Sequence, residues 1–147
     1  MKVFKNLFGR GDKIHVDEIA VAPGLLLGGA VIVESGSNND GEYVRWGNGL
    51  QICWVIKEPW PGAAAGSSYG EIFRSSEALY WYYPKSFYGI QPMVSGSASG
   101  SGWIVDSGGV SRDNMKSFAF RVLRALSSTT DPVVRLFAIG WWKEPEF

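Results

Sequence analysis

The residues best placed to do chemistry in this sequence lie in the Gly102–Asn114 region. Trp103 and Asp106 stand within one short strand-like run and its exit loop. Sugars present apolar C–H faces and a rim of hydroxyl groups, so a sugar site pairs an exposed aromatic ring with side chains that form fixed hydrogen bonds. The alternative is that Trp103 belongs to the core and that the polar residues form a solvated turn. We predict that a glycan or receptor site forms here from Trp103, Asp106, Arg112, Asp113 and Asn114.

Trp60 is a second candidate for ligand binding. It lies between Pro59 and Pro61, which would hold it rigidly on a loop. On the surface, the ring would form a second platform for a sugar. Buried, it would anchor the loop to the core instead, and the sequence leaves both interpretations open.

No pattern of catalytic residues is evident, and we expect that the protein is not an enzyme. The 14 acidic residues include no obvious pair of the kind that a glycosidase places on either side of its scissile bond, although Glu71, Glu77 and Asp106 lie in the aromatic-rich half. A polysaccharide hydrolase therefore stays only a remote alternative. A Ser/His/Asp triad would have to use His15, and Gly96–Gly102 lacks the Lys and the following helix of a phosphate-binding loop.

Metal and cofactor sites are not expected either. The sequence has one His and one Cys, Cys53, so it has neither a Cys/His cluster nor the means to form an intrachain disulfide. Within a strand-like run, Cys53 is best explained as a small buried apolar residue.

The composition indicates one globular domain of 147 residues. Its formal net charge is zero and its basic residues form no stripe, which argues against a nucleic-acid partner. The aromatic content is high, 14% with seven Trp, and suits uncharged partners such as sugars or another protein. No secretory signal is visible, and the apolar stretch Ile19–Val33 is too short and too interrupted to span a bilayer. We therefore expect a soluble protein made in the cytosol, without membrane insertion.

Short strand-like runs separated by turn signals follow a distinct N-terminal segment. Their spacing predicts an antiparallel β-sandwich of about six to eight short strands. In Lys116–Leu126 the period of two places Phe118, Phe120 and Val122 inward, although a helix over Asn114–Leu126 is the alternative. The other predicted strands are Gly29–Val33, Glu42–Trp46, Leu50–Ile56, Glu71–Tyr83, Ile90–Ser97, Gly102–Asp106 and Val133–Trp142.

Three Gly-, Ser- or Pro-rich stretches are predicted as loops between these strands: Ser35–Gly41, Pro59–Ser68 and Ser95–Gly102. In Glu71–Tyr83, Leu79, Trp81 and Tyr83 share one face and Ala78, Tyr80 and Tyr82 the other. Both faces are apolar or aromatic, which predicts that this strand is covered on both sides.

A hairpin is predicted where Glu42–Trp46 and Leu50–Ile56 flank Gly47-Asn48-Gly49, because Asn-Gly favours the type I′ turn of tight hairpins.

The surrounding stretch Glu34–Trp54, with its GEYVRW and LQICW runs, resembles the start of the C-terminal domain of many bacteriophage tail-fibre proteins. Later elements extend the resemblance to Lys143 and are similar to H-type lectin domains: YPKSF at Tyr83–Phe87, PMV at Pro92–Val94, FAF at Phe118–Phe120 and LFAIGWWK at Leu136–Lys143.

This resemblance implies a lectin-like β-sandwich that forms a homotrimer and acts as a receptor-binding tip on a virion, recognising a host-surface polysaccharide or protein. In such an assembly we expect Cys53 and Val44 in the core, and Trp46 and Trp54 near a subunit contact. Trp141 and Trp142 should point to opposite faces of the last strand. The residues expected at the oligomer interface are Tyr80, Trp81, Tyr82 and Trp142.

Residues 1–28 are predicted to be an attachment segment and 29–147 the sandwich domain. Phe4, Leu7 and Phe8 would dock the segment on other virion proteins, on the tail or the capsid, after assembly in the host cytoplasm. A virion decoration or adaptor protein that binds no glycan is the alternative function.

Overall fold

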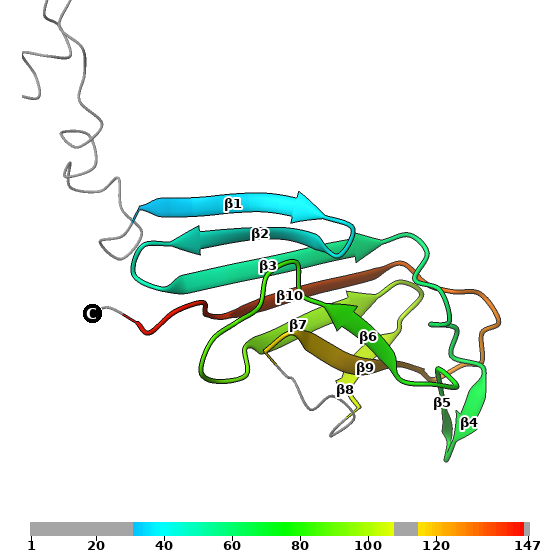
Figure 1. The fold of residues 1–147 in the computed structure, drawn as a ribbon. Coiled ribbons are helices and arrows are strands. Elements are labelled where there is room, and N and C mark those ends of the chain that lie inside the picture. The colour runs from blue at the N-terminus through cyan, green and yellow to red at the C-terminus, as the bar shows by residue number, and fades with distance from the viewer. Residues whose placement is uncertain (1–30, 108–114, 146–147) are drawn as a thin grey trace, which may run out of the picture.

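The computed structural model describes residues 31–107 and 115–145, and these residues form ten β-strands and no helix. The strands make two antiparallel five-stranded sheets that share one hydrophobic core (Figure 1). The predicted fold class, an all-β antiparallel sandwich, is therefore confirmed. Ten strands are present in the described residues rather than six to eight. The short strand β4 (Ser67–Tyr69) begins within the predicted loop Pro59–Ser68, and the single predicted run Glu71–Tyr83 is divided into β5 (Ile72–Arg74) and β6 (Leu79–Tyr82). No helix capable of crossing a membrane occurs in the described part of the chain.

The first sheet places the last strand of the chain in its interior, between two strands from much earlier in the sequence. In spatial order its strands are β1 (Ile32–Asn38), β2 (Gly41–Trp46), β3 (Leu50–Lys57), β10 (Val134–Trp141) and β7 (Met93–Ala98). The pairing of β3 with β10 runs over eight residues without a break, from Lys57 opposite Val134 to Leu50 opposite Trp141. This central pair is the rigid frame on which the rest of the sheet is built.

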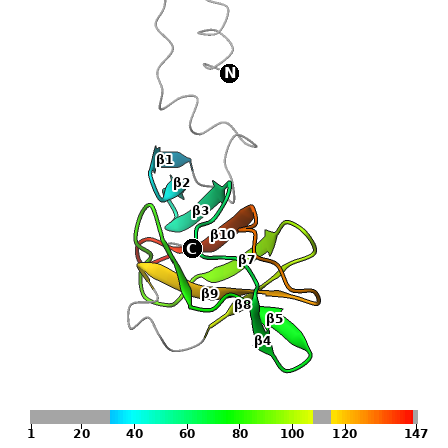
Figure 2. The same cartoon turned by 90° about the vertical axis from the view of Figure 1, so that its right-hand side faces the viewer.

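The second sheet is organised around β9 (Ser117–Arg124). One edge of β9 pairs with β5 near its C-terminal end and with β6 (Leu79–Tyr82) near its start, and the other edge pairs with β8 (Trp103–Asp106). Figure 2 shows β1 at one side of the sandwich and the β4–β5 hairpin at the opposite side. The helix considered for Asn114–Leu126 is not formed, because Ser117–Arg124 is strand β9.

Aromatic and branched side chains from both sheets fill the core. Phe118, Phe120 and Val122 are buried, as their alternation predicts. Trp60 packs edge-to-face on Phe120 with ring centroids 5.1 Å apart, and Trp81 packs the same way on Tyr83 at 5.0 Å. Such edge-to-face pairs fit the positive rim of one ring to the negative face of the other.

The β2–β3 hairpin is present, but its turn is not the type I′ turn that Asn-Gly favours. The amide of Gly49 donates to the carbonyl of Trp46 at 3.0 Å, and of the three loop residues only Gly49 has a positive φ, 99°. The Asn48 side-chain oxygen accepts from the amide of Leu50 at 3.1 Å. The loop therefore has three residues with glycine in the left-handed position, the next most common hairpin connection.

The burial of β2 corrects the prediction that Val44 is a core residue. Tyr43 is buried and pairs with the fully buried Cys53, whereas Val44 is on the opposite face of the sheet. Alternation within the strand allows either set to face inward, and the large ring of Tyr43 occupies the core. The prediction for Cys53 is confirmed.

Two predicted loops are largely strand. Ser35 to Asn38 belong to β1, and Ser95 to Ala98 belong to β7. In β7 the glycine has a packing role, because a Cβ at Gly96 would lie 2.4 Å from Cδ2 of Leu136 on the neighbouring strand. The small Ser and Gly residues of this stretch, which suggest a loop in the sequence, therefore allow β7 to approach β10 closely. The predicted strand at Gly29–Val33 is displaced to Ile32–Asn38, and its first residues lie outside the described part of the chain.

Candidate ligand-binding site

Trp103 is not a core residue: 53% of its surface is exposed, at the start of the edge strand β8. Asp106 is on the other face of the same strand, because Ile104 packs on the core and Asp106 follows it by two residues. The charge of Asp106 also acts on the buried Tyr83, which is consistent with this placement. The structure thus separates Trp103 from Asp106, and one compact site cannot contain both side chains.

The other residues of the predicted site have different locations. Arg112, Asp113 and Asn114 lie outside the described residues. Trp60 is 4% exposed and forms part of the core, so it anchors its loop and offers no platform to a ligand. The Nζ of Lys57 lies 4.6 Å from the centre of the Trp60 ring and covers it on one side.

Trp103 borders a hollow of about 180 Å³ that the sequence did not reveal as a unit. The turn between β7 and β8 forms one wall, and the end of β9 forms the other. We call this the Trp103 hollow, and its lining residues are Gly100, Ser101, Trp103, Arg124, Ala125 and Leu126.

The turn before Trp103 is tight and held in an unusual backbone conformation. Ala98 and Gly102 form an isolated antiparallel bridge, so the chain reverses within Ser99 to Ser101. Ser101 has a φ of 61°, the one positive value for a residue other than glycine in the described chain. Non-glycine residues in this region carry strain, and such strain is often found at binding sites.

The guanidinium of Arg124 lies against the backbone of Gly100. A Cβ at Gly100 would be 3.0 Å from Nη2 of Arg124, so the absence of a side chain there leaves room for the guanidinium. The hollow thus combines an exposed indole, a cationic fork of N–H donors and a serine hydroxyl. This combination can hold the apolar face of a ring and donate to its polar substituents.

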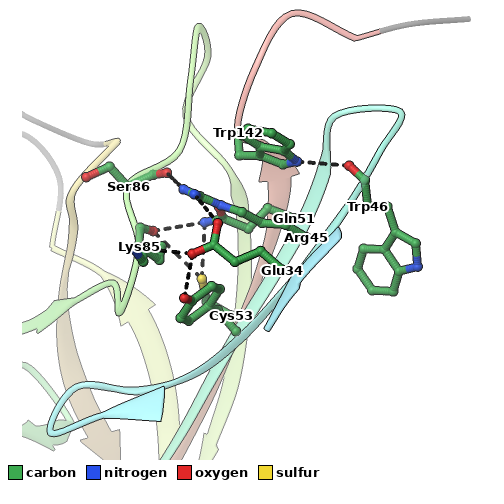
Figure 3. Close-up of polar contacts among 9 residues, drawn as sticks. Glu34, Arg45, Trp46, Gln51, Cys53, Lys85, Ser86 and Trp142 are labelled. Carbon is green, nitrogen blue, oxygen red and sulfur yellow. Dashed lines mark hydrogen bonds and ion pairs between the residues drawn. The ribbon is translucent and has the colours of Figure 1, made fainter. Parts of the chain in front are cut away.

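The most extensive polar cluster lies elsewhere, where the loop between β6 and β7 crosses the first sheet (Figures 1 and 3). Its centre is Arg45, whose Nη1 donates to Glu34 at 2.9 Å and whose Nε donates to Gln51 at 2.6 Å. Nη2 of Arg45 reaches the carbonyl of Ser86 at 3.3 Å, and its guanidinium lies 4.9 Å from the Trp142 ring. Arg45 is therefore fully engaged in holding the fold together.

The electrostatics of this cluster support a structural role. The hydrogen bond from the Tyr43 hydroxyl and the interaction with Arg45 lower the pKa of Glu34 to about 2, and the same hydrogen bond raises the pKa of Tyr43. Burial raises the pKa of the Cys53 thiol to about 11, so it stays protonated near neutral pH. Within the described residues, no group of three His, Cys, Asp or Glu side chains is arranged to hold a metal ion.

The residues predicted at an oligomer interface are split between the core and the surface. Trp81 is 1% exposed and lies in the core, so its assignment to an interface is wrong. Tyr82 is exposed and stacks on Tyr80 with ring centroids 6.5 Å apart. The indole of Trp142 donates to the carbonyl of Trp46 at 3.0 Å and fastens the segment after β10 to the β2–β3 hairpin (Figure 3). The docking residues Phe4, Leu7 and Phe8 lie outside the described part of the chain.

Comparisons with protein-family models, with curated proteins and with solved structures found no match for this chain.

Proposed function

We propose that this protein is a receptor-binding component of a virion and that it binds a host-surface glycan at the Trp103 hollow. The observation that carries this proposal is the exposed indole of Trp103 beside Arg124 and Ser101. The resemblance of the sequence to tail-fibre tips and H-type lectin domains supports it, and the sandwich fold is compatible with it. It does not depend on Asp106 or Trp60.

The size and chemistry of the hollow fit a single sugar ring. Its volume of about 180 Å³ is below the roughly 300–1,000 Å³ of sites for drug-sized ligands. An indole face covers the C–H side of a pyranose, while the Arg124 fork and the Ser101 hydroxyl face its oxygens. A site this small implies weak binding per copy, on the order of millimolar, and tight attachment then requires several copies acting together.

The test uses the full-length protein and surface polysaccharide, or fragments of it, from candidate bacterial hosts. Wild-type protein should bind one such glycan, and Trp103→Ala should lose most of that binding in titration calorimetry or on a glycan array. Tyr88→Ala is the matched control, because Tyr88 is an aromatic residue of similar exposure, 51%, outside the hollow. Equal binding by wild type and Trp103→Ala would overturn the site. If the wild type binds no glycan and instead co-purifies with a virion protein, the adaptor function takes its place.

A further inference from the structure

The first sheet is apolar on the face that points away from the core. The buried residues of β3 and β10 alternate with residues on this opposite side, which we call the outer face. An antiparallel sheet with one solvated face normally carries polar residues there. Here most of the positions are apolar. By this alternation the outer face comprises Glu42, Val44, Trp46, Leu50, Ile52, Trp54, Ile56, Met93, Ser95, Ser97, Arg135, Phe137, Ile139 and Trp141.

Strand register arranges these side chains in continuous rows across the sheet. Val44, Ile52, Ile139 and Met93 stand side by side on four neighbouring strands. The next row is Glu42, Trp54, Phe137 and Ser95. Met93 is 78% exposed, Ile56 62% and Phe137 42%, so the rows are open to an incoming surface.

The outer face is also shaped for interdigitation. Hollows of about 450 Å³ and 280 Å³ lie on it, and Trp54 and Ile56 line both, so these two side chains form a ridge between them. A ridge flanked by hollows fits a partner that presents its own ridges and hollows.

The size of the outer face is sufficient for a specific contact. Four strands about 4.8 Å apart and four rows about 6.8 Å apart cover roughly 500 Å². Ten of the fourteen positions are apolar, so the apolar part lies within the range of the largest apolar patches on monomers, which are often functional. Two such faces together would bury about 1,000 Å², the lower limit for a specific interface.

The charged residues of the outer face indicate that its partner is another copy of this chain. Glu42 and Arg135 are the two charged residues of the outer face, and neither forms an ion pair with another described residue. They lie on β2 and β10, the strands on either side of β3. A rotation axis parallel to β3 and in front of this face sets the β2 side of one copy against the β10 side of the next. Glu42 of one copy then approaches Arg135 of the next, whether the axis relates two copies or three.

We propose that copies of this chain pack on one another through the outer face, about an axis parallel to β3, with Glu42 and Arg135 paired between copies. Glu42 and Arg135 are one row apart along the strands, an offset of roughly 7 Å that the length of the arginine side chain accommodates. The homotrimer expected from the family resemblance is one assembly of this kind. The inference does not rest on glycan recognition, so either proposal can fail alone.

The test measures the mass of the full-length protein in solution by sedimentation equilibrium at tens of micromolar. The wild type should give a multiple of 16.1 kDa. Glu42→Arg and Arg135→Glu should each shift the mass toward the monomer by bringing like charges together, and the variant with both changes should recover the assembly. Phe137→Glu should give the monomer. Glu77→Arg, at an exposed residue in the connection between β5 and β6, should leave the mass unchanged.

Circular dichroism of each variant verifies that it is folded. A wild-type mass of 16.1 kDa over the whole concentration range would overturn the proposal, and it would direct attention to residues 1–30 as the cover of this face. A folded double variant that stays monomeric would also overturn it, because exchange of the two charges preserves the pairing that the proposal requires.

Discussion

Trp81 Nε1 donates a hydrogen bond of 2.8 Å to the backbone carbonyl of Asp40, and this contact ties the second sheet to the β1–β2 turn of the first. The ring itself is 1% exposed and packs edge-to-face on Tyr83. One side chain thus fills the core and satisfies a carbonyl at the turn that starts the β2–β3–β10 frame. In the sequence the same residue is one of a run of aromatic residues with no visible partner.

Trp81→Phe should lower the free energy of unfolding by about 1–3 kcal/mol, because it removes both the hydrogen bond and part of a buried ring. Denaturant unfolding at neutral pH measures this. Tyr82→Phe is the control, since Tyr82 is exposed on the same strand and should change stability by less than about 0.5 kcal/mol. Equal effects of the two changes would contradict the role of the Trp81–Asp40 contact.

Much of the fold was predictable because alternation and turn residues are local signals. The inward set Phe118, Phe120 and Val122 and the β2–β3 hairpin follow from them directly. The choice between Tyr43 and Val44 for the core was not predictable. Both alternating sets of β2 contain an apolar residue, and only the packing of the second sheet and the loop between β6 and β7 decides which set is inside.

The candidate site was predictable only in part. Trp103 could be selected from its own sequence neighbourhood, but Arg124 follows it by 21 residues and comes near through the β8–β9 pairing. The predicted site groups Asp106 with Trp103 because they are close in the sequence, but proximity in the sequence does not specify a face of a strand. The alternation that places Ile104 inward was the signal that could have separated them.

Gly96→Val should destabilise the protein by about 1–3 kcal/mol, since overpacking forces neighbouring side chains and backbone to shift. A Cβ at this position would also lie 2.6 Å from the carbonyl oxygen of Arg135, which cannot move without disturbing the β7–β10 pairing. Thermal unfolding measures the change. Gly47→Ala serves as the control, because its added Cβ would find Val33 at an ordinary 3.5 Å. A Gly96→Val variant as stable as the wild type would show that β7 is not held closely against β10.

Glu34→Gln should lower the free energy of unfolding at pH 7 and make it vary less with pH in the acid range. The pKa of Glu34 is lowered from 4.5 to about 2, so its contribution is fully present above about pH 4.5 and is lost as the pH falls toward 2. Because the side chain is 37% exposed, solvent weakens the Arg45 pair, and we expect a loss of about 1 kcal/mol. Urea unfolding of both proteins at pH 7 and pH 2.5 measures the difference, which should be smaller at pH 2.5. Glu71→Gln, at an exposed carboxylate in the turn between β4 and β5, is the control, and a constant difference between the two pH values would contradict the assignment.

Arg124→Lys should weaken glycan binding about tenfold and leave the free energy of unfolding within about 0.5 kcal/mol of the wild type. A lysine keeps the charge but lacks the planar fork that Arg124 presents beside Gly100, so directional hydrogen bonds to a sugar are lost while long-range attraction is retained. Arg74→Lys is the matched control, because Arg74 lies over Tyr69, 4.4 Å from its ring centre, and does not line the hollow. Titration of each variant with the glycan bound by the wild type measures the effect. If both substitutions weaken binding equally, overall charge and not the Trp103 hollow determines recognition.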